Sequence, residues 1–181
     1  MENRKKLKIC FMGGNQAGIV GVLTVLARGD RIVSGVSYSE DLTNILKILK
    51  VRTYKSIYDK SFIKRLQGAD LLLSVHGREI VDRNILKLPK YGGINIHPYL
   101  YKYKGADPVG HALKDREFNA SVGVHVIDEK IDSGRVIYEE FTDVAGSKSA
   151  DEVYNKLYPY YCKVILKALT RIENGSKKDK K

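Results

Sequence analysis

The sequence predicts an α/β protein with an open, mostly parallel twisted sheet, a mixed edge hairpin and a long C-terminal helix. Three observations indicate this class. Apolar runs alternate with segments of helical periodicity through residues 7–97. Two strands of alternating pattern then follow each other across a short loop, which is typical of a hairpin. Ser149 and Glu152 form a capping box before a long amphipathic segment.

The parallel part of the sheet is expected from five apolar runs, each followed by a helical pattern or a turn. The expected strands are residues 7–14, 31–38, 51–55, 69–77 and 92–98, and the expected helices are residues 16–29, 41–50, 61–66, 81–89 and 108–115. The run at 69–77 is nearly continuous, which predicts a strand buried on both faces.

The C-terminal part is expected to add the hairpin strands 121–128 and 134–144 and a helix over 149–174 that Pro159 bends or splits. Neither repeats nor an internal linker divide the chain. We therefore expect one domain over residues 1–172 and a charged flexible tail over 173–181.

Composition places the chain among ordinary globular proteins. With 43% hydrophobic and 29% charged residues, disordered and fibrous classes are disfavoured. Neither a membrane-spanning run nor a signal peptide is visible. Cys10 and Cys162 show no disulfide framework or metal-ligand spacing, and a reduced, cytoplasmic location is expected.

The net charge of +11 does not by itself require a nucleic-acid partner. Residues 1–8 hold four basic and one acidic side chain, and residues 171–181 hold five basic and two acidic ones. Six of the eleven positive charges thus lie at the chain ends. The remainder suits an anionic small-molecule substrate, and RNA-binding signatures are not seen.

A glycine-rich turn, GGNQAG, follows the first strand. Gly13, Gly14 and Asn15 favour two interpretations equally. They are either a phosphate-binding turn at a helix N-terminus or a turn that simply needs small residues. The glycine pattern and the missing acidic residue argue against a nicotinamide cofactor.

The chemistry is expected at the carboxyl ends of the strands, where open α/β sheets bind ligands. Asn95 and His97 are two apart on one strand and so share a face, which cannot be dry core without leaving two polar groups unpaired. Asp132 lies in the loop DEKIDSG and could hold His97 in its cationic form. An amide beside an imidazole suits a reaction that develops an oxyanion.

These residues resemble a known family. GGINIHPYLYKYKGADPVGHALKD followed by SVGVHVIDEKIDSGRVI is similar to the catalytic region of the formyltetrahydrofolate-dependent formyltransferases. That superfamily includes glycinamide ribonucleotide transformylase, methionyl-tRNA formyltransferase and the sugar N-formyltransferases. The resemblance covers roughly residues 7–140 and includes the Asn–x–His pair, the Lys104–Gly105 turn and the motif from Asp132 to Ile137. YLYKY departs from the family's usual loop after the histidine.

The resemblance implies a Rossmann-like fold and formyl transfer from 10-formyltetrahydrofolate to a primary amine. It implies that Asn95 and protonated His97 stabilise the oxyanion and that Asp132 orients His97 and helps remove the amine proton. The folate would lie against the two loops that flank the site, so the residues expected to bind it are Ser74, His76, Gly77, Arg78, Glu79, Ile80, Asp128 and Ile131.

The acceptor amine is the open question. The turn KGADPVGHAL resembles the amino-sugar and methionyl-tRNA branches, and no segment resembles the latter's C-terminal tRNA-binding barrel, so a nucleotide-linked amino sugar is expected. Glycinamide ribonucleotide is the alternative acceptor. If water attacks the formyl group in place of an amine, the protein is a deformylase. A non-catalytic folate- or nucleotide-binding protein is the alternative from another class.

Several further residues carry two interpretations. We expect Gly13, Gly14, Asn15, Lys104, Gly105 and two loop tyrosines, Tyr99 and Tyr101, to contact substrate, although the tyrosines suit the covering of apolar surface equally well. His125 either lines the site or makes a structural hydrogen bond. The segment LYPYY at 157–161 suits core or a contact in a homodimer. Metal-ligand spacing is absent, so no metal is predicted.

Overall fold

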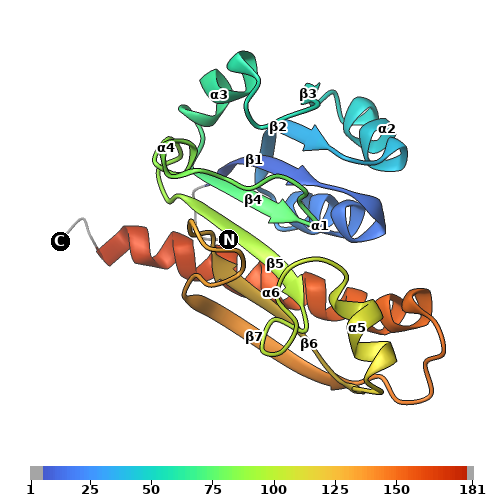
Figure 1. The fold of residues 1–181 in the computed structure, drawn as a ribbon. Coiled ribbons are helices and arrows are strands. Elements are labelled where there is room, and N and C mark those ends of the chain that lie inside the picture. The colour runs from blue at the N-terminus through green and yellow to red at the C-terminus, as the bar shows by residue number, and fades with distance from the viewer. Residues whose placement is uncertain (1–5, 179–181) are drawn as a thin grey trace.

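The computed structural model describes residues 6–178 and confirms the predicted class. The elements in chain order are β1 (Lys8–Gly13), α1 (Asn15–Ala27), β2 (Arg31–Ser37), α2 (Glu40–Ile48), β3 (Thr53–Tyr54), α3 (Lys60–Leu66), β4 (Leu71–Val75), α4 (Arg83–Leu86), β5 (Gly93–Pro98), α5 (Pro108–Lys114), β6 (Asn119–Val126), β7 (Val136–Asp143) and α6 (Ala150–Lys178). Figure 1 shows these elements arranged around a single twisted sheet.

The sheet has the order β3-β2-β1-β4-β5-β6-β7. Strands β1 to β5 pair in parallel, whereas β6 pairs antiparallel with both β5 and β7, which confirms the mixed edge and the hairpin. The chain extends from β1 to β2 and β3 on one side and then crosses to β4 on the other. The carboxyl ends of β1 and β4 therefore flank the topological switch point, where sheets of this kind bind ligands.

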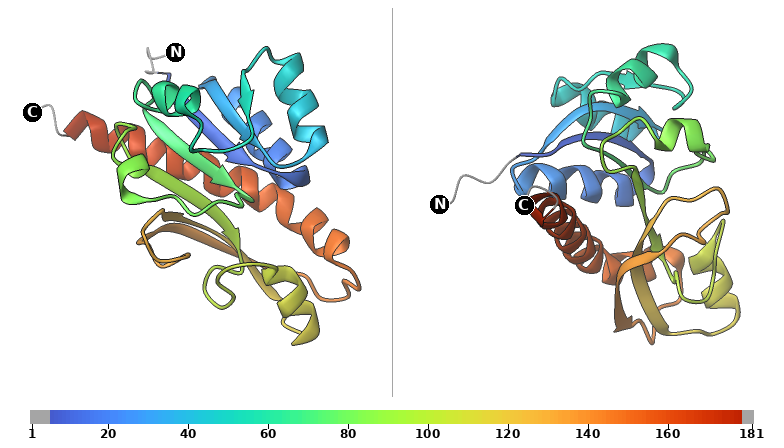
Figure 2. Two further views of the ribbon diagram at one scale, coloured as in Figure 1. Left: turned by 45° about the horizontal axis from the view of Figure 1, so that its top comes forward. Right: turned by 90° about the vertical axis from the view of Figure 1, so that its left-hand side faces the viewer.

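Both faces of the central strands are covered, because alternate side chains of a strand point to opposite faces. In β1, Ile9 and Phe11 join the core formed with α1 and α6, while Cys10 and Met12 join the core formed with α3 and α4. In β4, Leu72 joins the second core and its two neighbours the first. The strand expected to be buried on both faces is thus confirmed, and Figure 2 shows the two helical layers.

Helix α6 is longer than the sequence predicts. Pro159 lies inside it without splitting it, and the helix continues to Lys178. The expected tail over 173–181 is therefore wrong for residues 173–178, while 179–181 lie outside the described residues. Glu173 is only 5% exposed, and its Oε2 accepts from Arg28 Nη2 at 2.7 Å. Arg28 also pairs with Asp30, so this buried ion pair joins the end of α6 to the end of α1.

Within residues 6–178, none of the helices combines the length and the apolar character needed to cross a membrane.

Replacing Glu173 with Ala should lower the free energy of unfolding by about 1–3 kcal/mol, because it leaves a buried guanidinium short of one charged partner. Arg28 keeps Asp30, which is why the loss should stay below that of a fully orphaned charge. Chemical denaturation measures the change. Asn174→Ala, an exposed neighbour on the same helix, is the control and should not destabilise. Equal stabilities of the two variants would show that the pair does not hold α6 in place.

Candidate active site

A cavity of about 490 Å³ opens at the carboxyl ends of the central strands. The elements that line it are the start of α1, the segment after β4, the end of β5, the start of α5, the loop between β6 and β7, and α6. This volume is within the range of ordinary small-molecule sites, about 300–1,000 Å³. The predicted catalytic residues Asn95, His97 and Asp132 all line it.

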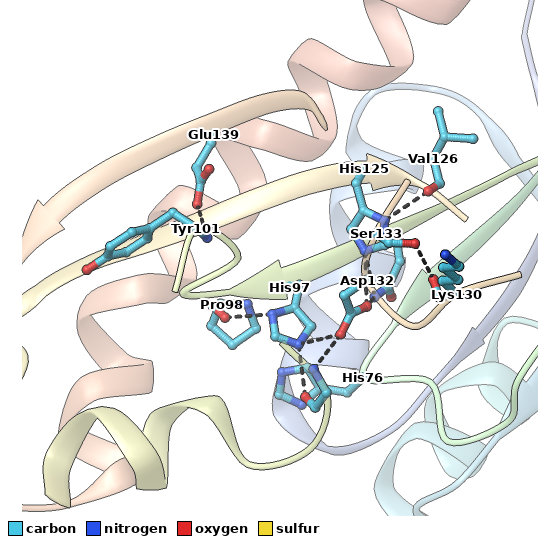
Figure 3. Close-up of polar contacts among 12 residues, drawn as sticks. His76, His97, Pro98, Tyr101, His125, Val126, Lys130, Asp132, Ser133 and Glu139 are labelled. Carbon is cyan, nitrogen blue, oxygen red and sulfur yellow. Dashed lines mark hydrogen bonds and ion pairs between the residues drawn. The ribbon is translucent and has the colours of Figure 1, made fainter. Parts of the chain in front are cut away.

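Asp132 is the centre of the polar cluster, which Figure 3 shows. Its Oδ1 lies 3.3 Å from Asn95 Nδ2 and 3.2 Å from His125 Nε2. Its Oδ2 lies 3.1 Å from His97 Nε2 and accepts from Gly105 N at 2.7 Å. Burial raises the pKa of this carboxyl, but the hydrogen bonds from His125 and His97 outweigh burial and hold the pKa well below its ordinary value. Asp132 is therefore an anion at neutral pH.

His97 is surrounded by acceptors. Its Nδ1 lies 2.7 Å from the carbonyl oxygen of Pro98, and its Nε2 lies 3.0 Å from that of Gly105 as well as close to Asp132. Because carbonyl and carboxylate oxygens only accept, both ring nitrogens must donate, which is the bonding pattern of an imidazolium. Burial opposes the charge, yet the hydrogen bond and the negative charge of Asp132 raise the pKa of His97 above its ordinary value.

Two glycines allow the loops to meet at this cluster. Gly105 has φ of +83°, which a side chain would strain, and it both donates to Asp132 and accepts from His97. A Cβ on Gly134 would lie 1.8 Å from the carbonyl oxygen of Val126. Only glycine therefore lets the chain after Asp132 pass so close to β6.

His125 is the residue that sequence reasoning left undecided. It lies opposite Asn95 in the antiparallel register of β5 and β6, and its Nδ1 donates to the carbonyl oxygen of Val126 at 2.9 Å. This bond turns Nε2 toward Asn95 and Asp132. The alternating pattern of β6 placed His125 near the site, but the register that brings it to Asp132 could not be deduced from one sequence.

The residues expected to bind folate all line the cavity: Ser74, His76, Gly77, Arg78, Glu79, Ile80, Asp128 and Ile131. Glu79 differs from the others because its carboxylate already accepts hydrogen bonds from other parts of the protein. It accepts from the hydroxyl of Tyr38 at 2.6 Å and from the backbone N–H of Ile57 at 3.1 Å, and it also bonds Ser56. This carboxylate holds the loop after β4 against the end of β2.

The expected substrate contacts are only partly brought together. Asn15 and Gly105 line the cavity, whereas Gly13, Gly14, Tyr99, Tyr101 and Lys104 do not. Tyr99 is 1% exposed and its hydroxyl donates to the carbonyl oxygen of Glu117, so it belongs to the core. The hydroxyl of Tyr101 donates to Asn119 and its ring contacts Phe141, away from the site. For both tyrosines the covering of apolar surface is the interpretation that the structure supports.

The glycine turn is also largely structural. A Cβ on Gly13 would lie 2.4 Å from the carbonyl oxygen of Val75, which explains the glycine without a ligand. The N–H of Gly14 donates to that same oxygen, and the N–H of Asn15 donates to Ser39 Oγ at 2.9 Å. Two of the amides that a phosphate would need are therefore already bonded.

A wall that the sequence did not assign to the site comes from α6. Tyr154 lines the cavity. Tyr161 does not line it, but its hydroxyl lies 2.9 Å from Nε2 of His76, which does. Tyrosines on a helix are more often core than site, and only the packing of α6 against the sheet reveals this position. Within residues 6–178 no group of three or more His, Cys, Asp or Glu side chains has an arrangement that could hold a metal ion.

The comparisons with known proteins agree with this geometry. Residues 13–169 match the formyl transferase family. The chain belongs to this family. A curated relative is the methionyl-tRNA formyltransferase of Fusobacterium nucleatum, 28% identical over 97% of this chain and 62% of the relative. The chain thus spans about three-fifths of the length of the curated relatives it matches.

Solved structures confirm the fold. Glycinamide ribonucleotide transformylase 1 from Symbiobacterium toebii has a TM-score of 0.79 and 19% identity, and the match covers 94% of this chain and 89% of that one. WlaRD, a sugar 3N-formyl transferase crystallised with dTDP and 5-N-formyl-THF, has a TM-score of 0.73 and 19% identity over 95% of this chain and 65% of that one. The family match over residues 13–169 confirms the resemblance to the formyltransferase superfamily, and these structures agree with it in fold.

Replacing Asp132 with Asn should lower the pKa of His97, because it removes the neighbouring charge that opposes the effect of burial. In the wild type the charged form of His97 stabilises the fold below its unfolded pKa of about 6.5, and this contribution is lost as pH rises through the higher folded pKa. NMR titration of the His97 ring in both proteins measures the difference, and the signal of exposed His111 is the internal control. The same His97 titration in both would show that Asp132 does not hold the charge.

Proposed function

We propose that this protein transfers a formyl group from 10-formyltetrahydrofolate to a primary amine, with a nucleotide-linked amino sugar as the first candidate acceptor. The observation that carries the proposal is the cluster in the cavity, where anionic Asp132 lies against Asn95 and an imidazolium at His97. A site that only binds folate or a nucleotide has no need of this arrangement. The family supports the same reaction.

The cluster suits attack of an amine on the formyl carbon. The oxyanion that develops there needs donors, which one N–H of Asn95 Nδ2 and the Nε2–H of His97 supply. The Asn95 N–H would move from His125 Nε2 to the substrate oxygen, and the His97 N–H would move from the Gly105 carbonyl. Asp132 keeps His97 charged and orients a water that relays the proton lost by the attacking amine. The bond that forms is nitrogen to formyl carbon, and the bond that breaks joins that carbon to the folate nitrogen, which receives the relayed proton and leaves as a neutral amine.

The donor is expected between the loop after β4 and the loop between β6 and β7. Apolar side chains suited to a flat ring line this region of the cavity: Ile80, Val81, Ile127 and Ile131. Gly77, Arg78 and Asp128 offer backbone and charged groups at the same place. Glu79 positions this loop and is not a ligand in our proposal, because Tyr38, Ser56 and Ile57 already bond its carboxylate.

Three acceptors remain to be distinguished. A nucleotide-linked amino sugar is supported by the turn KGADPVGHAL, which resembles the amino-sugar and methionyl-tRNA branches, while the fold itself is shared with both a sugar formyl transferase and a glycinamide ribonucleotide transformylase. Methionyl-tRNA is the second candidate, because a curated relative over most of this chain carries that activity in its name. Glycinamide ribonucleotide is less favoured, since two amides of its expected phosphate turn are already bonded.

Asn95→Ala, His97→Gln and Asp132→Asn should each lower kcat by about 10²-fold to 10³-fold, because each removes or discharges a group that acts on the developing oxyanion. The release of tetrahydrofolate measures turnover, and circular dichroism checks that the fold is kept. His111→Gln, an exposed histidine outside the cavity, is the matched control and should keep wild-type kcat. Normal turnover in any of the three variants would refute the role of that residue.

An acceptor panel tests the substrate class. It holds dTDP-linked amino sugars, glycinamide ribonucleotide, methionyl-tRNA and water alone, each with 10-formyltetrahydrofolate. We expect turnover with an amino sugar. Turnover with methionyl-tRNA alone would assign the second candidate instead, and turnover in water alone would make the protein a deformylase. Folate binding without turnover on any acceptor would favour the non-catalytic alternative.

A further inference from the structure

His76 is the third histidine of the cavity and, unlike His97 and His125, is not part of the Asp132 cluster. It follows β4 with φ of +56°, a left-handed conformation that is uncommon outside glycine and costs about 1–3 kcal/mol. It lines the cavity, and Figure 3 shows it on the opposite side of His97 from His125. The surrounding structure therefore holds His76 in a strained conformation at the site.

Tyr161 fixes the ring of His76 from behind. The side chain of Tyr161 is fully buried, and its hydroxyl lies 2.9 Å from His76 Nε2, the one hydrogen-bond partner it has among the described residues. If Nε2–H donated, the phenolic hydrogen would be left without an acceptor in the core, at a cost of about 1–3 kcal/mol. The favoured arrangement has the tyrosine O–H donating to Nε2.

The proton of His76 is then on the other nitrogen. Burial, together with the positive charge of His97, lowers the pKa of His76 to about 4, so the ring is neutral at pH 7 and carries a single proton. With Nε2 accepting from Tyr161, that proton is on Nδ1. Tyr161 thereby selects the tautomer of His76.

Nδ1 of His76 is open to the cavity. It has no protein partner among residues 6–178, and it is not a buried orphan, because the single buried side-chain atom without a partner in that range is Ser147 Oγ. The space that His76 borders is the cavity. The ring of Tyr154 packs edge-on against His76, with centroids 5.3 Å apart, and completes this wall.

We propose that Tyr161 positions His76 so that Nδ1–H donates a hydrogen bond to an oxygen of the acceptor substrate, making His76 a specificity-determining residue. The ligand class is an oxygen-rich amine, with a sugar hydroxyl or a diphosphate oxygen as the bonded atom. The inference rests on the proposed function. The sequence assigned His76 to the folate, whereas this inference assigns it to the amine substrate. The reason is that the His76 side chain contacts α6 and not the loop between β6 and β7.

The tautomer is measurable without any substrate. In a ¹⁵N-labelled protein at pH 7, the His76 ring should show a protonated Nδ1 and an unprotonated Nε2. Tyr161→Phe removes the donor and should change this pattern. The matched control, Tyr160→Phe on the same helix, should leave it unchanged, because among the described residues His76 contacts Tyr154 and Tyr161 but not Tyr160. A proton on Nε2 in the wild type would overturn the inference.

Binding distinguishes the two oxygen sources. A dTDP-linked amino sugar should shift the Nδ1 signal of His76. A shift with dTDP alone as well would identify a phosphate oxygen, whereas a shift with the sugar conjugate alone would identify a hydroxyl. A signal that neither ligand moves would overturn the inference.

In steady-state kinetics, the inference predicts that the KM for the amine substrate changes while the KM for the folate does not. Tyr161→Phe should raise the KM for the accepted amine about tenfold and leave the KM for the folate donor unchanged, while Tyr160→Phe should change neither. An unchanged acceptor KM in a folded Tyr161→Phe protein would refute the role of His76. Failure of the proposed function would look different, because the wild-type protein itself would then turn over none of the amines in the panel.

Discussion

The site depends on the largely buried carboxylate of Asp132 and on the four polar groups that lie against it. They come from four places in the chain: Asn95 on β5, His97 two residues later, Gly105 in the next loop and His125 on β6. A buried anion is costly unless it is bonded in this way, so the carboxylate and these groups specify one another's positions. The antiparallel register of β5 and β6, with Asn95 opposite His125, is what allows the four to converge.

The same region carries backbone strain. Asn15, His76, Asp107 and Asp132 all have positive φ, and all four line the cavity. Each costs about 1–3 kcal/mol, so the rest of the fold must hold these residues in place. The sheet can do this because both faces of its central strands are packed by helices, and because the ion pair between Arg28 and Glu173 holds α6 across the back of the sheet.

The sequence predicted most of the fold and the centre of the site. The sequence patterns that indicate strands and helices are local, so they can be recognised without knowledge of distant contacts. The two-residue spacing of Asn95 and His97 likewise places both side chains on one face of the strand. What the sequence left open or missed depended on packing. Tyr99 is core, the structural interpretation of the GGNQAG turn is supported because the carbonyl oxygen of Val75 lies 2.4 Å from where a Cβ of Gly13 would be, and α6 runs beyond the expected end at residue 174 to Lys178.

The cavity keeps two histidines in opposite charge states. His97 is charged because Asp132 lies against it, and His76 is neutral because it is buried and because the charge of His97 repels a second proton. The carboxylate of Asp132 thus acts on both states, on His97 by contact and on His76 through the charge of His97, which adds to the larger effect of burial. Removing the charge of Asp132 removes the support for the imidazolium and, with it, part of what keeps His76 neutral. The acid–base residues and the proposed acceptor contact are therefore one coupled electrostatic unit.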